Sequence, residues 1–369
     1  MCVEITFAQY PVQEYTIVHN DRAKYIVPPD SKRLHWLGSV PIGGTIAIIG
    51  LIGNIISFCV WNRILKWKIR GNHSTAIYFI SLSVCDGGVL VFFLLTDTIK
   101  SNHPEIAKTY SYAAFYSWFG FPLFFIFLVA SIWLIVGVTL NRFLMMFLPL
   151  KIHSFYSKTQ TYLGIFAISM FSLLINIPHF FSYHPKETNA TYMLAFTEYG
   201  ESQRSINYEF WVHCMLLVLI PWFTIAILNI SLIYLIIKRT TKIKRSKESK
   251  TFKSNETRER RMTITLLSIT FTFLILLSWQ CVTQCFWMLG VGKEDKNNSR
   301  WNLIDSSFAF AKISVIINCA INWILYCLTG TMFRKELMRL ICRRHKVNLA
   351  TSEKPFRIKD KSSEEMVAK

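Results

Sequence analysis

The sequence contains few charged residues for its length. Charged side chains make up 17% of its 369 residues, whereas hydrophobic side chains make up 52%. A soluble globular domain carries about 25% charged residues, so this composition excludes an ordinary soluble protein. The surplus of apolar side chains must face lipid.

Acidic residues are especially scarce, with 22 Asp and Glu against 41 Lys and Arg. The resulting formal charge of +19 could indicate a nucleic-acid-binding protein. Most of that charge, however, lies in segments 238–264 and 329–369, which flank apolar runs. Retention in the cytoplasm and attraction to anionic lipid explain this placement better. We therefore expect membrane lipid among the partners and no nucleic acid.

The sequence also lacks the motifs of common enzymes. It has no Gly-rich phosphate loop and no His-Glu pair at zinc-binding spacing. Seven of its nine cysteines lie within apolar runs, which leaves too few for a disulfide framework. We predict that the chain is not an enzyme, has no catalytic residues and requires no cofactor.

Long apolar runs, by contrast, are abundant. A helix crosses a hydrocarbon layer of about 30 Å in roughly 20 residues, and seven runs reach that length. Backbone amides in lipid must be satisfied within their own segment, which predicts an all-α membrane protein with a seven-transmembrane helix bundle. The expected spans are Pro41–Trp61, Thr75–Leu95, Ala113–Leu140, Thr161–Phe181, Phe210–Ile237, Thr265–Leu289 and Ser307–Leu328.

The distribution of Lys and Arg predicts the orientation of this bundle. If the N-terminus is outside, the inner segments hold 29 of the 41 basic residues and the outer segments hold 11. Basic loops are retained in the cytoplasm, so we expect a multi-pass plasma-membrane protein. Its parts are an extracellular segment 1–40, a seven-span domain 41–328 and a cytoplasmic tail 329–369. Residues 333–344 of the tail alternate apolar and basic residues, which predicts an amphipathic interfacial helix.

Five polar residues interrupt the spans, where their burial is costly and usually reflects a role. They are Asn54, Asp86, Ser131, Asn318 and Asn322. Each could simply hydrogen-bond one helix to another. A mid-membrane carboxylate such as Asp86 also needs a cation, a proton or a hydrogen-bond network around it.

With the seven spans, these residues make the chain resemble the rhodopsin-like G-protein-coupled receptors over most of its length. Every motif stands in order on the expected span. The residues that carry the resemblance are Asn54, Leu82 with Asp86, Asn141-Arg142-Phe143, Pro221, Trp279 and Asn322-Trp-Ile-Leu-Tyr326.

The resemblance implies a receptor that transmits ligand binding to a heterotrimeric G protein, with arrestin and receptor kinases as further partners. Arg142 would contact the G protein, while Pro221, Trp279, Asn322 and Tyr326 would act in the conformational switch. Asn141 stands where the family has an acid, and a neutral hydrogen bond is about half as strong as a charged one. We therefore expect raised basal signalling.

The resemblance also implies a sodium ion as an allosteric modulator. Its ligands would be Asp86, Ser131, Asn318 and Asn322, although a water-filled network could serve these residues equally well.

The chain also departs from the family pattern in its prolines and cysteines. Cys281 and Trp323 replace the prolines of the sixth and seventh helices, so both kinks should be softer. Ser117 replaces the cysteine that normally bridges the third helix to an extracellular loop, and the loop 182–209 has no cysteine either. We expect that loop to be more mobile than usual because no crosslink limits it.

The ligand class follows from two further absences. Phe124 stands where amine receptors carry an acid, and Ile316 stands where opsins carry a lysine. The segments "INIPHFFSYH" and "NCAINWILYCLTGTMFRKELMRLIC" are similar to those of invertebrate FMRFamide-type neuropeptide receptors, with His179 in place of the usual arginine. A receptor for a non-peptide small molecule and a seven-span transporter are the alternatives.

A peptide amide ending in Arg-Phe would need an acid for its guanidinium group and an aromatic wall for its ring. Asp97 is the first choice for the acid, and Lys312 would pair with Asp97 or with an acid of the ligand. The full set of expected ligand-binding residues is Asp97, Phe124, Glu209, Gln280, Gln284, Trp287, Asp305 and Lys312.

Three modification sites are also expected. Asn189 and Asn297 begin outer glycosylation sequons. Cys342, at the end of the amphipathic segment, could carry palmitate or be a plain interfacial cysteine.

Overall fold

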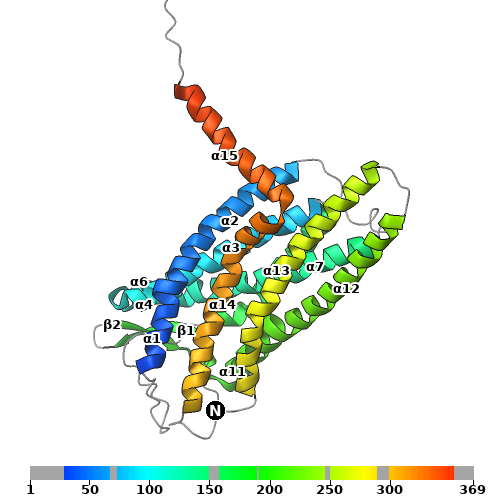
Figure 1. The fold of residues 1–369 in the computed structure, drawn as a ribbon. Coiled ribbons are helices and arrows are strands. Elements are labelled where there is room, and N and C mark those ends of the chain that lie inside the picture. Colours follow the sequence, from blue (N-terminus) through cyan, green and yellow to red (C-terminus); the bar gives the residue numbers. More distant parts are fainter. Residues whose placement is uncertain are drawn as a thin grey trace, which may run out of the picture.

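The computed structural model describes residues 29–66, 73–148, 158–188, 191–245, 250–288 and 299–352. Within these residues, seven helices are long and apolar enough to cross a membrane. They pack side by side as one bundle (Figure 1). The predicted seven-transmembrane, all-α fold is thereby confirmed.

Each span is assembled from one or more helical elements. In chain order, the spans consist of α1 (Pro29–Leu37), η1 (Gly38–Ile42) and α2 (Gly43–Lys66); α3 (His73–Phe93), η2 (Leu94–Thr98) and α4 (Ile99–Asn102); α6 (Tyr110–Phe115), η3 (Tyr116–Gly120) and α7 (Phe121–Phe147); α9 (Lys158–Ile175) and η4 (Ile177–Phe181); α11 (Gln203–Trp211), η5 (Val212–Leu219) and α12 (Ile220–Arg245); α13 (Lys250–Met288); and α14 (Ser299–Thr329).

The connections lie at the two ends of the bundle. Short helices α5 (Pro104–Ala107) and α10 (Glu198–Glu201) and strands β1 (Tyr183–Thr188) and β2 (Thr191–Phe196) lie at one end, called here the hairpin end. The helix α15 (Thr331–Ser352) follows α14 at the opposite end, called here the tail end, and extends past α2 (Figure 1).

Several helices are longer than the apolar runs predict. The first span begins at Pro29 instead of Pro41, α13 begins at Lys250 instead of Thr265, and α15 extends beyond 333–344. Hydropathy reports only the part of a helix that lies in lipid, whereas Lys, Arg and Glu are good helix formers that continue it into water. Pro41 lies inside the π-helix η1, where a widened turn accommodates its missing N–H.

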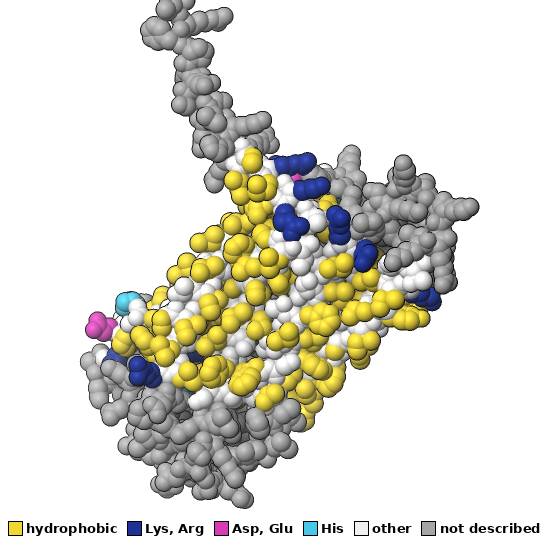
Figure 2. Space-filling view, viewed as in Figure 1, with side chains coloured by type: hydrophobic (Ala, Val, Ile, Leu, Met, Phe, Trp, Pro, Cys, Tyr) yellow, Lys and Arg dark blue, Asp and Glu magenta, His cyan; other side chains and the backbone are white. Residues whose placement is uncertain are grey.

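The spans differ in how much of their surface is buried. Of the most apolar window of each span, 67% is buried for the third span and 17% for the fourth. The third span is therefore the centre of the bundle and the fourth lies at its edge. Hydrophobic side chains cover the flank of the bundle, and Lys and Arg gather near α15 (Figure 2), as expected for a lipid-facing belt beside a basic membrane surface.

The hairpin is attached to the bundle without a disulfide. Strands β1 and β2 pair antiparallel, with Tyr183 opposite Phe196. The backbone N–H of Tyr192 donates to the carbonyl of Lys108 at 2.9 Å, and the ring of Tyr183 packs edge-on against Phe121 at 4.9 Å. Ser117 is buried and donates to the Ala113 carbonyl of its own helix. These contacts argue against a looser loop, although its mobility stays a prediction.

An aromatic cluster closes the tail end. Trp61, Phe79, Tyr326 and Phe333 come from four different helices, are at most 1% exposed, and have ring centroids 4.8 to 5.7 Å apart. Arg63 of α2 also donates to Glu336 of α15 at 2.6 Å. Helix α15 is therefore anchored by both apolar packing and an ion pair.

The tryptophan that replaces the seventh-helix proline has a matching space on the first span. A Cβ atom at Gly53 of α2 would overlap with the indole ring of Trp323 of α14, and one at Gly50 would lie 2.6 Å from the Cβ of Ala320. These glycines allow the two helices to approach closely. The bulky substitution at position 323 is thus accommodated by the absence of a side chain on the neighbouring helix.

We predict that Gly53→Ala lowers stability by about 1–3 kcal/mol, because the added methyl group overpacks the contact with Trp323. Gly87→Ala on α3 is the matched control, since a Cβ there meets nothing within 4 Å and Ala favours a helix over Gly. The midpoint of thermal unfolding in detergent measures both effects. A Gly53→Ala midpoint equal to or above that of Gly87→Ala would contradict this account.

Candidate functional site

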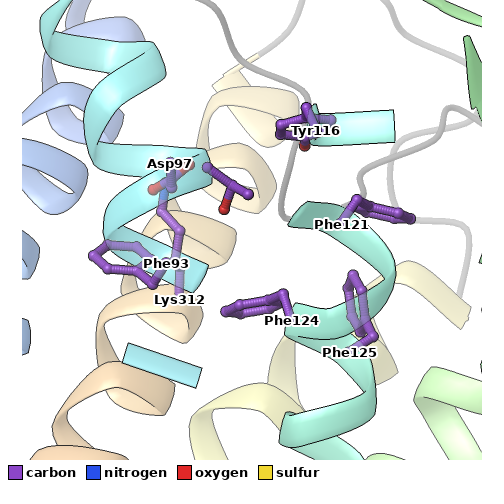
Figure 3. Close-up of a pocket in the computed structure, with 8 residues that line it drawn as sticks. Phe93, Asp97, Tyr116, Phe121, Phe124, Phe125 and Lys312 are labelled. Carbon is purple, nitrogen blue, oxygen red and sulfur yellow. The ribbon is translucent and has the colours of Figure 1, made fainter. Parts of the chain in front are cut away.

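A pocket lies at the hairpin end between the second, third and seventh spans. It contains about 350 Å³ of empty space, including space open to solvent. Asp97 and Lys312 lie on one side, Tyr116, Phe121 and Phe125 on the other, and Phe124 between them (Figure 3). The lining residues are Phe93, Thr96, Asp97, Tyr116, Phe121, Phe124, Phe125 and Lys312.

The second and third spans deviate from α-helical geometry where they form this pocket. Asp97 belongs to the π-helix η2 and Tyr116 to the π-helix η3. Two carbonyls near the η2 turn, those of Leu95 and Thr96, accept hydrogen bonds from the hydroxyl of Tyr112. A Cβ at Gly120 would lie 2.6 Å from Thr96 Cγ2, so this glycine permits the close approach of the two spans. Such π-bulges are frequent at functional sites.

An ion pair marks the charged side of the pocket. Lys312 Nζ donates to Asp97 Oδ2 at 2.9 Å and to Ser39 Oγ at 2.7 Å, which connects the seventh span to the second and the first. Asp97 is one of the two partners expected for Lys312. No pattern in the sequence points to Ser39, because its contact with Lys312 depends on how the first helix packs against the seventh.

A second lysine lies beside this pair. Lys100 Nζ lies 5.1 Å from the ring centroid of Tyr116, and the charges of Asp97 and Lys312 both act on it. Sequence reasoning missed Lys100. Its position three residues after Asp97 on a helix was the available signal, since residues three apart share a face.

Two of the other expected ligand-binding residues, Glu209 and Gln280, are not among the described residues that line the pocket. Glu209 Oε1 lies 3.9 Å from Nδ1 of His179, which is fully buried and stacks on Phe125. Glu209 is therefore behind the aromatic wall. Gln280 is 5% exposed. The side chains of Gln284, Trp287 and Asp305, and the whole of Asn189 and Asn297, lie outside the described residues.

A polar cluster occupies the middle of the bundle. Asp86 Oδ1 accepts from Ser131 Oγ at 2.5 Å, and Oδ2 accepts from Asn322 Nδ2 at 2.7 Å. The thiol of Cys319 is the third contact of this carboxylate. The structure thus brings Asp86, Ser131 and Asn322 together, but it places Cys319, not Asn318, beside Asp86. The backbone carbonyl of Cys319 accepts from Asn54 Nδ2 at 3.0 Å, which links the first span to this region.

The sixth span is rotated so that Trp279 does not point into the centre of the bundle, where its proposed switch role would place it. Trp279 is 43% exposed, and its Nε1 donates to the Ser307 carbonyl of α14 at 3.0 Å. The buried residues of this stretch are Leu277 and Gln280. Trp279 therefore packs at the lipid-facing junction of α13 and α14 in this structure. Pro221 is buried at the start of α12, directly after the π-helix η5, whose wider turn suits a residue without an N–H.

The Asn-Arg motif lies at the tail end of α7. Arg142 is 3% exposed and Asn141 is 1% exposed. Both amide atoms of Asn141 are buried and find no hydrogen-bond partner among the described residues. The neutral hydrogen bond expected from Asn141 to Arg142 is therefore not formed. The hydroxyl of Tyr326 is likewise buried with no partner in the described part of the chain.

Another arginine holds the end of α7. Arg239 Nη2 of α12 donates to the Met146 carbonyl at 2.6 Å, and Thr263 Oγ1 of α13 lies 3.8 Å from Met146 Sδ. The last carbonyls of a helix have no intrahelical partner, and a cation there is favoured by the helix dipole. Arg239 is a second residue that the sequence did not single out, because one arginine in a basic segment carries no distinguishing pattern.

Comparison with known proteins gives two kinds of similarity. The family model for the 7 transmembrane receptor (rhodopsin family) matches residues 59–326. The chain is 24% identical over 322 residues to the FMRFamide receptor of Drosophila melanogaster, covering 84% of this chain and 54% of that protein. It is 23% identical over 298 residues to the C5a anaphylatoxin chemotactic receptor 1 of Rattus norvegicus, covering 79% and 76%. It thus spans about half the length of the first relative.

We predict that Asp97→Asn and Lys312→Gln each lower stability by about 3 kcal/mol, because each leaves a largely buried charge without its partner. The double variant should unfold at a higher temperature than either single variant, since it leaves neither charge. Thermal unfolding in detergent compares the three. If the double variant lost as much as the two single variants combined, the two side chains would not be acting as a pair.

Proposed function

The chain belongs to the rhodopsin family of seven-transmembrane receptors, which are receptors and not enzymes, and we propose that its ligand is an extracellular neuropeptide of the FMRFamide type. The observation that carries the proposal is the pocket, whose aromatic wall and charged side suit a peptide end that carries both a ring and a charge. The similarity to the FMRFamide receptor over 84% of this chain supports it.

We place the hairpin end outside the cell and the tail end in the cytoplasm of the plasma membrane. The segments at the tail end hold most of the Lys and Arg residues, as cytoplasmic loops do. The peptide then enters from the hairpin side. Because the pocket is small, only its terminal residues reach Phe121, Phe124 and Phe125, and the remainder lies over β1 and β2.

A small non-peptide ligand is the second candidate. The observation that favours it is the small size of the pocket, which contains about 350 Å³ of empty space even when the space open to solvent is included. Such a ligand would use the same lining residues without contacting the hairpin.

Coupling to the G protein takes place at the tail end. Arg142 is permanently charged and carries five donors, so it can exchange partners without losing a proton. Movement of α12 and α13 away from Met146 would expose it. Arrestin and receptor kinases would bind the same end, with the Ser and Thr residues of the tail as kinase targets. Cys342 is an exposed free thiol on a helix whose Met338 and Ile341 are also exposed, which suits an interfacial helix with palmitate.

Ligand-evoked guanine-nucleotide exchange tests the proposed function. Purified receptor in nanodiscs with a heterotrimeric G protein is exposed to a library of amidated neuropeptides and to a library of small metabolites. Stimulation by a peptide that ends in Arg-Phe-amide is the expected result, and Arg142→Ala should abolish it. Stimulation by small metabolites alone would establish the second candidate in its place.

Basal activity tests the effect of Asn141 on Arg142. We predict that Asn141→Asp lowers agonist-free nucleotide exchange, because an aspartate at this position can form an ion pair with Arg142 and an asparagine cannot. Arg239→Gln should raise it, because the tie between α12 and Met146 is lost. Lys238→Gln is the control, since Lys238 lies 5.8 Å from the ring centroid of Tyr234 on its own helix. Equal basal rates in all four proteins would remove this explanation.

A sodium ion in the middle of the bundle is a further part of the proposal. The Asp86 carboxylate and the Ser131 hydroxyl offer hard oxygen ligands to such a cation, and the Asn322 carbonyl oxygen could be a third. We predict that replacing sodium with potassium raises agonist-free exchange in the wild type and has no effect in Asp86→Asn. An equal response of both proteins to the ion exchange would exclude a site at Asp86.

A further inference from the structure

We propose that the peptide ligand adds a third strand to the hairpin by pairing its backbone antiparallel to the outer edge of β1. This inference rests on the proposed function and specifies how the receptor holds the part of the peptide that lies outside the pocket. It follows from the register of the two strands, from the contacts of β2 and from the direction in which β1 leaves the pocket.

The hydrogen bonds of the hairpin show which backbone groups of β1 point outward. In an antiparallel pair, opposite residues alternate between hydrogen-bonded and non-hydrogen-bonded pairs. The N–H of Tyr192 donates to the carbonyl of Lys108, so it points away from β1, and the residue opposite Tyr192 is Glu187. That pair is therefore non-hydrogen-bonded, and the N–H and C=O of Glu187 point away from β2. The same orientation recurs two residues earlier, at Pro185.

These outward groups of β1 can receive a further strand. The N–H and C=O of Glu187 and the C=O of Pro185 have no hydrogen-bond partner within the described part of the chain, and neither residue is buried. A row of unpaired backbone groups at a sheet edge is a template for another extended chain, and peptides bind many proteins by adding a strand to such an edge. A proline suits this edge because its missing N–H would point away from β2.

The outer edge of β2 is already in use. The Lys108 carbonyl accepts from Tyr192 there, and the ring of Tyr110 packs edge-on against the ring of Tyr192 with centroids 5.2 Å apart. The segment that leads into α6 therefore covers this edge. A peptide on β2 would have to displace that segment, whereas a peptide on β1 finds no described backbone group bonded to Pro185 or Glu187.

The direction of β1 sets the direction of the peptide. The strand begins at Tyr183, which is 5% exposed and packs against Phe121 of the pocket wall, and it ends at Thr188, which is exposed. A peptide whose carboxyl end lies in the pocket must run from the Thr188 side toward the Tyr183 side. It is therefore antiparallel to β1, and one extended chain can contact both the strand edge and the pocket.

This pairing uses two N–H groups of the peptide that are two residues apart. One peptide residue lies opposite Glu187 and exchanges two hydrogen bonds with it. The residue two positions nearer the carboxyl end donates its N–H to the Pro185 carbonyl, and Pro185 has no N–H to give in return. The N–H of the peptide residue between them points away from β1. The expected signature is a period of two along the peptide backbone.

N-methylation of the peptide backbone tests the pairing on the wild-type receptor. The probe is the most potent peptide ending in Arg-Phe-amide, methylated at one backbone nitrogen at a time outside the last two residues. We expect two positions, two residues apart, to lose about tenfold or more in potency for nucleotide exchange, because the methyl group removes the donor and fills the space of its acceptor. The position between them should stay within about threefold. Equal losses at adjacent positions, or no loss anywhere, would overturn the inference.

A receptor variant tests the same contact from the other side. Glu187→Pro removes the N–H that would donate to the peptide, and the two strands should still pair because that N–H takes no part in the hairpin. We expect the unmodified peptide to be about three- to tenfold less potent on Glu187→Pro than on Glu187→Ala, which lacks the same side chain but keeps the N–H. Surface labelling checks that both variants are folded and delivered. Equal potencies on the two variants would contradict the added strand.

The outcomes separate this inference from the proposed function. A peptide that stimulates exchange without a period of two in its N-methyl scan, or with equal potency on the two Glu187 variants, would overturn the added strand and leave the peptide receptor standing. A panel in which no peptide stimulates exchange would overturn the peptide ligand and, with it, the strand proposed for that peptide.

Discussion

The carboxylate of Asp86 imposes the main constraint on this bundle. A charge in the hydrocarbon region has no water to solvate it, so its oxygens must be satisfied by neighbouring helices. Ser131 of α7 and Asn322 of α14 supply those hydrogen bonds, which fixes the rotation of three spans relative to one another. Through the carbonyl of Cys319, Asn54 adds the first span to the same region.

Around that centre, side-chain packing takes the place of the seventh-helix proline and of the extracellular disulfide that the family usually has. Trp323 fits against Gly53, so the first and seventh spans approach each other without a proline kink between them. The hairpin is held by Tyr183, Phe121 and a backbone hydrogen bond to Lys108 where a disulfide would be expected. Each replacement depends on close contact between side chains, which is why a single methyl group at Gly53 matters more than one at Gly87.

Different contacts hold the helices together at the two ends of the bundle. At the hairpin end, the Lys312–Asp97 pair joins the first, second and seventh spans at the place where a ligand would enter. At the tail end, Arg239 joins the fifth span to the carboxyl end of α7, next to the arginine that would contact a G protein. A ligand that changes the first set of contacts can influence the second only through helices that repack between discrete arrangements. The shared cluster at Asp86 lies between them.

The sequence alone determined the seven spans, because lipid requires long uninterrupted apolar helices. It also identified Asp86, Ser131 and Asn322 as a polar cluster within the spans, and Asp97 as a candidate partner of Lys312. It could not decide how each helix is rotated or where it bends. One residue turns a helix by about 100°, so Cys319 could take the place expected for Asn318, and Gln280 the buried position beside Trp279. Lys100, Ser39 and Arg239 acquire their roles from contacts between distant segments. Those contacts depend on π-turns and on the close approach of helices, which only the tertiary structure fixes.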